Sequence, residues 1–268
     1  MQTYGMFAFL GMGLTLGLIG GGGSILTVPI LVYLLGMSAL PATAYSLLIV
    51  GVTALVGAGI ALKNREVDLR TGALFALPSF VGVYATRAWV VPAIPDPVLT
   101  LGGYALQKGT LILAVFSVLM ILASVTMIRP TSVASSPSKP MRYRWVWVAA
   151  EGLGVGAITG FVGAGGGVLI IPALVLLTGL PMKIAVGTSL AIIAAKSLLG
   201  LMGDLQSGLT LDWGLLLPAL GLSLVGLAVG VRLRARFSDK SLKRGFGVFV
   251  LILGSAMLAQ QVFALRTP

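Results

Sequence analysis

The segment GLIGGGGSIL, residues 17–26, places four consecutive glycines inside an otherwise apolar run. A second segment of this kind, GFVGAGGGVL, covers residues 160–169, and a proline follows each segment at the same distance, Pro29 and Pro172. Glycine in a helix interior costs about 1 kcal/mol relative to alanine, so a run of glycines favours a break. The sequence therefore predicts two helices that are interrupted at equivalent places.

The composition is that of an integral membrane protein. Of the 268 residues 57% are hydrophobic and 9% are charged, and the mean hydropathy is +1.06. Soluble domains carry about 25% charged residues, so we expect a lipid bilayer around this chain. The first charged side chain is Lys63. The N-terminal apolar segment thus lacks the basic start of a signal peptide and is expected to remain in the mature protein.

Residue types that the chain lacks exclude several functions. It contains no Cys and no His, which removes disulfides, thiolate chemistry, imidazole bases and the usual transition-metal sites. The acidic residues form no carboxylate pair, and no GxxxxGK[ST] nucleotide motif occurs. We therefore expect no enzyme activity, no metal and no cofactor. The net charge of +11 indicates basic cytoplasmic loops rather than a nucleic-acid-binding surface.

Apolar runs fall into two series that are separated by a polar linker. A membrane-spanning helix needs about 20 residues, so the runs that begin at residues 25 and 168 are predicted to be half-helices. Each series then holds a glycine-broken pair and three long helices. The predicted organisation is a first transmembrane repeat at 1–128, a cytoplasmic linker at 129–144 and a second repeat at 145–268. The runs are 4–19, 25–35, 42–62, 71–91, 111–128, 145–162, 168–177, 184–202, 213–231 and 246–264.

An internal duplication relates the two series. Thirteen residues around the first glycine run recur without a gap at an offset of 143, and the pair Pro29 and Pro172 is among them. One residue later in register, Asp68 and Gly82 correspond to Asp212 and Gly226. The duplication therefore reaches the third long helix of each repeat. The thirteen first-repeat residues are Gly17, Gly20, Gly22, Gly23, Leu26, Pro29, Leu31, Val32, Leu34, Gly36, Ala42, Ser46 and Leu47.

The basic residues predict how the repeats are oriented. If each broken pair crosses the membrane an even number of times, each repeat crosses an odd number of times and the repeats are inverted. Fourteen Lys and Arg residues then lie on one side, against Arg87, Lys108 and Arg266 on the other, whereas parallel repeats split the same charges eight to nine. Basic residues gather in the cytoplasm. We therefore predict inverted repeats with both termini on the opposite side.

The glycine breaks are predicted to bind an anion. Unpaired backbone N–H groups are tolerated at membrane depth only where protein buries them or a polar cavity receives them, and broken helices of inverted-repeat transporters aim their N-termini at anionic substrates. The first break would free the amides of Ser24, Ile25 and Leu26, at a helix start with roughly half a positive charge. The predicted binding backbone comprises Gly20, Gly21, Gly22, Gly23, Ser24, Ile25, Gly163, Gly165, Gly166, Gly167 and Val168.

Close helix packing is the alternative role for glycine in membrane helices. Packing explains Gly152, Gly156 and Gly160, which are spaced four residues apart and so share one helix face. Four adjacent glycines exceed what packing needs, so we favour binding for the two runs.

Lys196 is the one Lys or Arg well inside a predicted span, and its equivalent in the first repeat is Thr53. A cation at the bilayer centre costs about 2.5–3.5 kcal/mol, which favours a role as counter-charge for the anion. The alternative is that its long side chain snorkels toward the interface near Asp204. Both Lys196 and Thr53 are therefore candidate substrate-binding residues.

The remaining polar candidates are one acid and three hydroxyls. Glu151 is a candidate proton carrier, although its closeness to Arg144 and to the interfacial tryptophans favours a place at the membrane surface. Ser46, Thr188 and Ser189 lie near helix starts, where a hydroxyl either donates to an anion or bonds back to the helix backbone.

The duplicated element GxxGxGGGxxxxP, seen as GLIGGGGSILTVP and GFVGAGGGVLIIP and followed by an Ala-x-x-x-Ser helix start, resembles the sulfite exporter TauE/SafE family, also called the toluenesulfonate uptake permeases. The resemblance covers both repeats. It implies a multi-pass transporter of the bacterial inner membrane for sulfite, sulfonates or other small organic anions, with both termini then periplasmic. The first copy departs at Ser24, where the second has Gly167, so the two repeats need not contact substrate equally.

These observations predict a secondary transporter, an exporter, that binds a small anion at the membrane midplane between the two breaks. No carboxylate cluster suggests a coupled ion, so export driven by the membrane potential is expected, with proton-coupled exchange as its rival. The alternative functions are an anion channel and a non-catalytic membrane subunit of a larger complex. A homodimer is compatible with the sequence.

Overall fold

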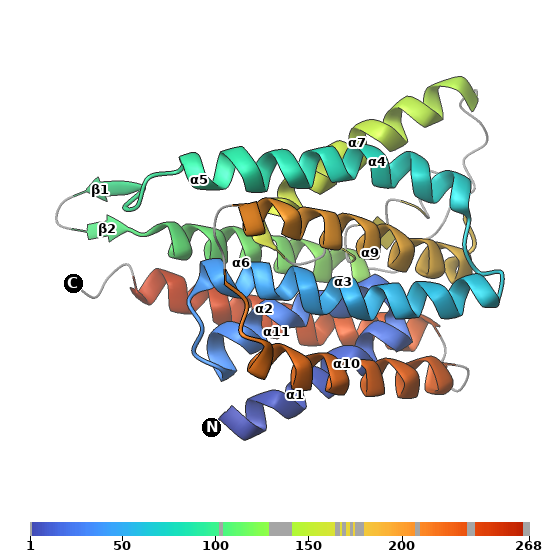
Figure 1. Ribbon diagram of the computed structural model, residues 1–268, viewed down its shortest axis with the longest axis horizontal. Coiled ribbons are helices and arrows are strands. Elements are labelled where there is room, and N and C mark those ends of the chain that lie inside the picture. The colour runs from blue at the N-terminus through green and yellow to red at the C-terminus, as the bar shows by residue number, and fades with distance from the viewer. Residues whose placement is uncertain are drawn as a thin grey trace.

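The computed structural model describes residues 2–101, 104–128, 141–163, 167, 170–171, 174, 180–206, 210–234 and 239–264. Over these residues the chain forms a bundle of helices that lie roughly along one direction (Figure 1). Six helical segments in this part of the chain are long and apolar enough to cross a membrane by length and composition. The predicted helical, multi-pass architecture is confirmed to that extent.

The first repeat begins with α1 (Gln2–Ile19), and three short helical segments follow it before the next long helix. The interrupted part consists of the 3₁₀ helix η1 (Gly20–Leu26), the single turn α2 (Thr27–Pro29) and the π-helical turn η2 (Ile30–Leu34). The long helices are α3 (Ala39–Lys63), α4 (Leu69–Ala85), continued by η3 (Thr86–Val90) and α5 (Val91–Ala93), and α6 (Lys108–Ile128).

The second repeat contains α7 (Met141–Val162), α9 (Met182–Gln206), α10 (Trp213–Leu233) and α11 (Asp239–Ala264). These helices correspond in order to α1, α3, α4 and α6 of the first repeat. Helices therefore occur at these predicted spans of both repeats; in the second repeat α9 and α10 are among the six segments long enough to cross a membrane, whereas α7 and α11 contain shorter apolar helices, Val146–Val162 and Gly247–Phe263. Residues 129–140 of the predicted linker and most of the second half-helix at 168–177 lie outside the described residues.

A short β-hairpin is the one departure from the predicted all-α fold in the described part of the chain. Strand β1 (Leu99–Leu101) pairs antiparallel with β2 (Tyr104–Leu106), with Leu99 opposite Leu106. The hairpin connects α5 to α6 at the end of the bundle where α11 also ends (Figure 1).

The helices of one repeat pack against those of the other. The main pairs are α1 with α10, α4 with α7, α3 with α9 and α6 with α11. Because α1 corresponds to α7 and α10 to α4, the pairs α1–α10 and α4–α7 are equivalent. The pairs α3–α9 and α6–α11 each join a helix to its own counterpart. The duplication in the sequence is thus reproduced in the packing.

Glycine contacts show the same correspondence at the level of single residues. A Cβ on Gly156 of α7 would lie 2.7 Å from Ser79 Cα, and a Cβ on Gly13 of α1 would lie 2.7 Å from the carbonyl carbon of Ser223. These two contacts occupy equivalent positions in the repeats. Gly152 and Gly160 likewise meet the backbone of α4, so the packing role predicted for the four-residue glycine series is confirmed.

Helices α3 and α9, which correspond in the two repeats, run in opposite directions. The amide of Asp68, just before α4, donates to Thr188 Oγ1 near the start of α9 (2.9 Å), and Arg87 after α4 meets Asp204 near the end of α9. Helices α4 and α9 are therefore parallel. Because a short loop joins α3 to α4, α3 is antiparallel to its counterpart α9, as Figure 1 shows.

Aspartates at corresponding positions of the duplication begin α4 and α10. Asp68 Oδ1 accepts from the amides of Arg70 (3.0 Å) and Thr71 (3.1 Å), and Asp212 Oδ1 accepts from the amide of Gly214 (2.8 Å). A carboxylate at this place satisfies free N–H groups and complements the helix dipole.

We predict that Gly156→Ala lowers the stability of the folded protein by about 1–3 kcal/mol, because the new Cβ would overlap the Ser79 backbone. The matched control is Gly154→Ala on the same helix, where a Cβ meets no atom within 4 Å. Thermal unfolding of the purified variants in detergent measures the difference. Equal midpoints for the two variants would contradict this account of the α4–α7 contact.

Candidate functional site

The first glycine run reverses the chain inside the bundle. Gly20 has a left-handed φ of +76°, a conformation that favours glycine. Beyond it the chain returns along α1, because a Cβ on Gly23 would lie 2.7 Å from Leu16 Cα, and one on Gly5 would lie 3.2 Å from Leu34 Cβ. The predicted break is confirmed, and it produces a helical hairpin.

The amides at this break differ from the expectation. We expected the N–H groups of Ser24, Ile25 and Leu26 to be free, yet these residues belong to the 3₁₀ helix η1. In such a helix each N–H bonds to the carbonyl three residues earlier, which uses all three donors. The donors without a partner inside η1 are therefore those of its first residues, the glycines. That expectation was wrong: the free donors lie about one helical turn earlier in the chain than expected, because the glycines themselves are helical.

The two glycine breaks meet in the interior. A Cβ on Gly21 would lie 2.6 Å from Gly167 Cα, and a Cβ on Gly167 would collide with the carbonyl of Gly21. Gly163, at the start of the second break, has φ +72° and so matches Gly20. Gly20, Gly21, Gly22, Gly23, Ser24 and Ile25 are all buried. Gly165, Gly166 and Val168 lie outside the described residues.

The predicted hydroxyl ligands have different surroundings. Ser24, Thr53 and Ser189 donate to carbonyls of their own helices, at 2.7, 2.6 and 2.7 Å. Thr188 accepts the Asp68 amide at the loop end of α4. Buried Ser46 Oγ has no hydrogen-bond partner, so both its donor and its acceptor capacity are unused.

Lys196 lies within the bundle on α9, with 1% of its surface exposed. Its Nζ donates to Thr159 Oγ1 of α7 at 2.7 Å, and Thr159 Oγ1 in turn lies 3.2 Å from the carbonyl of Gly156. The side chain points into the protein and does not reach the interface, so the snorkelling alternative is wrong. A buried lysine amine with one hydroxyl partner keeps further N–H donors that an anion could accept.

Glu151, the candidate proton carrier, lies on α7 and is partly buried. Its Oε2 is buried and has no hydrogen-bond partner. Eight residues, or about 12 Å along a helix, separate it from Thr159, which holds Lys196. The structure therefore leaves Glu151 distant along α7 from the buried lysine.

Arg87 is a second buried cation, and sequence reasoning missed it. Its Nη1 donates to Thr43 Oγ1 of α3 at 3.0 Å and to both oxygens of Asp204 on α9 at 3.1 Å. The side chain is 1% exposed. The predicted charge distribution places Arg87 outside the membrane, although this residue falls inside the apolar run 71–91. That position, four residues before the end of the run, was the signal for burial.

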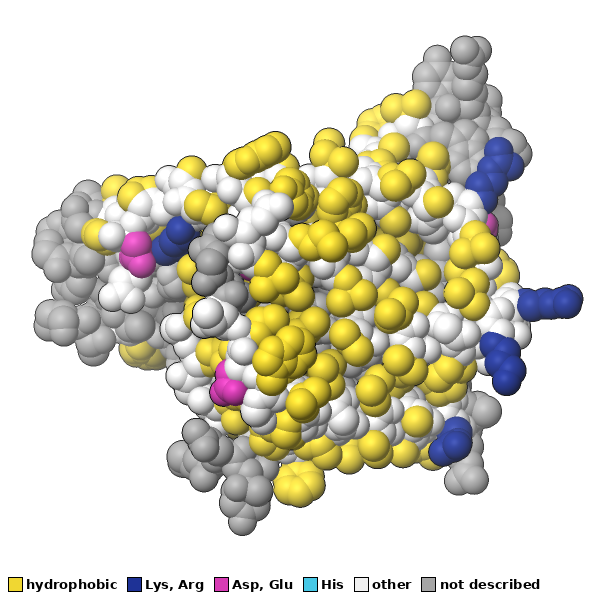
Figure 2. All heavy atoms as spheres, in the orientation of Figure 1, with side chains coloured by type: hydrophobic (Ala, Val, Ile, Leu, Met, Phe, Trp, Pro, Cys, Tyr) yellow, Lys and Arg dark blue, Asp and Glu magenta, His cyan; other side chains and the backbone are white. Residues whose placement is uncertain are grey.

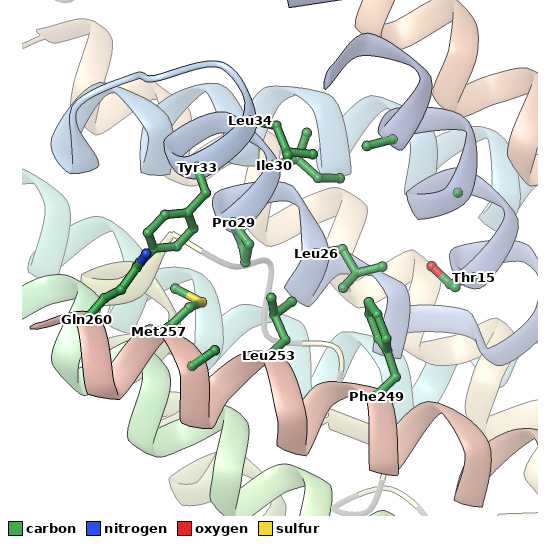
Figure 3. A pocket seen from close by; sticks show the side chains of 13 residues that line it. Thr15, Leu26, Pro29, Ile30, Tyr33, Leu34, Phe249, Leu253, Met257 and Gln260 are labelled. Atoms are coloured by element: carbon green, nitrogen blue, oxygen red, sulfur yellow. The ribbon is translucent and has the colours of Figure 1, made fainter. Parts of the chain in front are cut away.

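An apolar pocket lies apart from these charges. It has a volume of about 580 Å³ between α1, the η1–η2 segment and α11, and it is lined mostly by aliphatic side chains (Figure 3). Tyr33 and Gln260 lie at one end of it, and Leu26 faces Phe249 at the other. The lining contains neither Lys196 nor Arg87, so this pocket does not suit an anion.

We predict that Lys196→Met raises the thermal midpoint of the ligand-free protein and abolishes the stabilisation that an anion provides. Methionine fills a similar volume without the cost of a buried charge, and Thr159 Oγ1 keeps the carbonyl of Gly156 as a partner. The matched control is Lys183→Met at the exposed start of α9, which should change neither quantity. An unchanged anion response in Lys196→Met would exclude Lys196 from the site.

Comparison with known proteins supports the family resemblance that the glycine pattern suggested. A family model described as "Sulfite exporter TauE/SafE" matches residues 5–257. A "Probable membrane transporter protein" of Xylella fastidiosa (strain 9a5c) is 29% identical over 246 residues, which is 90% of this chain and 88% of that protein. The "Probable membrane transporter protein YunE" of Bacillus subtilis (strain 168) is 25% identical over 267 residues, 92% of this chain and 93% of that protein. No solved structure matches the chain. The resemblance inferred from the duplicated glycine element is confirmed, and the chain belongs to the sulfite exporter TauE/SafE family of membrane transporters.

Proposed function

We propose that the protein is a secondary transporter that exports small sulfur-containing or organic anions, which bind where the two glycine breaks cross. The contact of Gly21 with Gly167 carries this proposal, because it brings the broken helices of both repeats to one point. Ile193 of α9 lies against Gly21, and Lys196 follows one helical turn later. Backbone donors and a buried ammonium are therefore close to the same crossing.

The proposed arrangement in the membrane is a pair of inverted repeats. The antiparallel directions of the corresponding helices α3 and α9 support it. In Figure 2, Lys and Arg side chains gather at the end of the molecule that carries the α3–α4 loop in Figure 1. Because basic residues favour the cytoplasm, we assign this end to the cytoplasm of a bacterial inner membrane. The start of α1 and the end of α11 are then periplasmic.

The topology predicts opposite signals from reporters at two positions. A fusion in the linker at Thr131 should be active with a cytoplasmic reporter, and a fusion after Pro268 with a periplasmic one. The physical reason is the excess of basic residues on the linker side. Alkaline phosphatase and green fluorescent protein fusions measure this, and the same signal from both positions would exclude inverted repeats.

The membrane potential is the proposed driving force. The cell interior is electrically negative, and one elementary charge that crosses 100 mV gains about 2.3 kcal/mol. An anion that leaves the cell therefore moves with the potential. Among the described residues no group of three or more acidic side chains is arranged to hold a coupling cation, and uniport of a monovalent anion requires none.

We expect sulfite transport by the full-length protein in liposomes to respond to a potential set with potassium and valinomycin, because net charge crosses the membrane. A pH gradient at zero potential should drive no accumulation. Unlabelled sulfite on the far side should accelerate exchange, as expected for a carrier; its failure to do so would indicate a channel. Accumulation that is driven by pH and lost in Glu151→Gln would instead assign proton coupling to Glu151.

Two glycine variants test whether the substrate passes the point where the two glycine breaks cross. In Gly21→Ala the new Cβ would lie 2.6 Å from Gly167 Cα, so transport should be lost. Gly59→Ala of α3 is the control, since a Cβ there meets no atom within 4 Å. The elution profile and thermal midpoint of each variant report folding. Full transport by a folded Gly21→Ala protein would remove the crossing from the substrate path.

A further inference from the structure

Arg87 presents an unused pair of donors inside the protein. Its Nη1 is bonded to Thr43 and Asp204, but its Nε and Nη2 atoms are buried and have no hydrogen-bond partner. A buried donor without a partner has lost its hydrogen bonds to water and gained none in return, and this loss is larger for a charged group. Such groups in a native protein call for an explanation, and a ligand that arrives only during function supplies one.

The two free atoms form one edge of the guanidinium. The N–H groups of Nε and Nη2 point the same way from a rigid plane, which matches two oxygens on one central atom. The opposite side of the guanidinium is fixed by Thr43 of α3 and Asp204 of α9. Arg87 is therefore held in one orientation, with its two-donor edge buried and unpaired among the described residues.

This edge faces the second glycine break. A Cβ on Gly163 would collide with Arg87 Nη2 and with Thr43 Cβ. The Gly163 amide bonds to the Thr159 carbonyl at 2.8 Å, and Thr159 Oγ1 receives Lys196 Nζ. Both buried cations therefore lie at the last turn of α7, where the second break begins.

Carboxylates are scarce in the sequence around this turn. Arg87 and Lys196 are two buried cations, and Asp204 is the carboxylate that contacts one of them. The sequence between Glu151 and Asp204 contains no acidic residue. A monovalent anion at the last turn of α7 would balance the remaining positive charge.

The second break differs here from the first. The positions that correspond to Arg87 and Asp204 in the other repeat are Val231 and Ala61, and Thr53 corresponds to Lys196. The backbone is duplicated, but the charged groups occur at one break only. One anion per protomer follows from this difference.

We propose that the Nε–Nη2 edge of Arg87 is a subsite for the oxyanion group of the substrate. The anion is one with two or more oxygens on one atom, such as sulfite, a sulfonate or a carboxylate. Lys196 contributes a second positive charge, and Asp204 orients the guanidinium without contacting the anion. This inference rests on the proposed anion transport and adds the residue that distinguishes oxyanions from halides.

The test is isothermal titration calorimetry of the purified full-length protein with sulfite, methanesulfonate and chloride. Arg87→Lys keeps the charge but loses the two-donor edge, so affinity for both oxyanions should fall at least ten-fold while weak chloride binding is unchanged. Arg232→Lys, at an exposed place on α10, is the control and should bind like the wild type. The titration should give one oxyanion per protomer.

Asp204→Asn separates binding from a structural role. The amide oxygen still accepts from Nη1, but the competing charge is gone, so oxyanion affinity should stay or increase. If Arg87 only connects α3, α4 and α9, both variants will lower the thermal midpoint and the folded Arg87→Lys protein will bind oxyanions normally. That result, or a wild type that binds neither oxyanion, overturns the inference.

The transport assay distinguishes this inference from the proposed function. Binding that depends on Arg87 without any anion flux in liposomes would refute transport and leave the subsite. Anion flux with the same half-saturating sulfite concentration in wild type and Arg87→Lys would refute the subsite and leave transport.

Discussion

The backbone contact between Gly21 and Gly167 is the constraint on which the rest of the arrangement depends. Each residue lies where a Cβ of the other would be, so the breaks cross only because both positions lack a side chain. Gly20 and Gly163 precede this contact with matching left-handed φ values. Polar backbone at membrane depth needs protein around it, and here the partner helices of the two repeats, α3 with α9 among them, surround the crossing.

The two repeats share a backbone plan but differ in charge. Equivalent glycines pack on equivalent helices, as the contacts of Gly13 with α10 and of Gly156 with α4 show. Lys196 and Arg87, in contrast, have neutral counterparts. Since an isolated buried charge is costly, both cations require compensation, which Asp204 provides for one of them.

Much of the fold could be predicted from the sequence because its determinants are local or repeated. Hydropathy located the spans, the glycine runs located the breaks, and the constant offset identified the repeats. The packing series at Gly152, Gly156 and Gly160 followed from spacing alone. The amides of Ser24 to Leu26 did not, because the continuation of η1 through the glycines depends on the protein packed around them.

The candidate site, too, could be predicted only in part from the sequence. The sequence by itself determined that this is a multi-pass membrane protein with two equivalent helix breaks, because composition, glycine and proline act on the local chain. Only the tertiary structure decided that the breaks touch, that Lys196 turns inward to Thr159 and that Arg87 is buried against Asp204. The residues in these contacts are separated by 37 to 146 positions along the chain. Hydropathy and spacing carry no information about distances across the bundle, which the packing of whole helices sets.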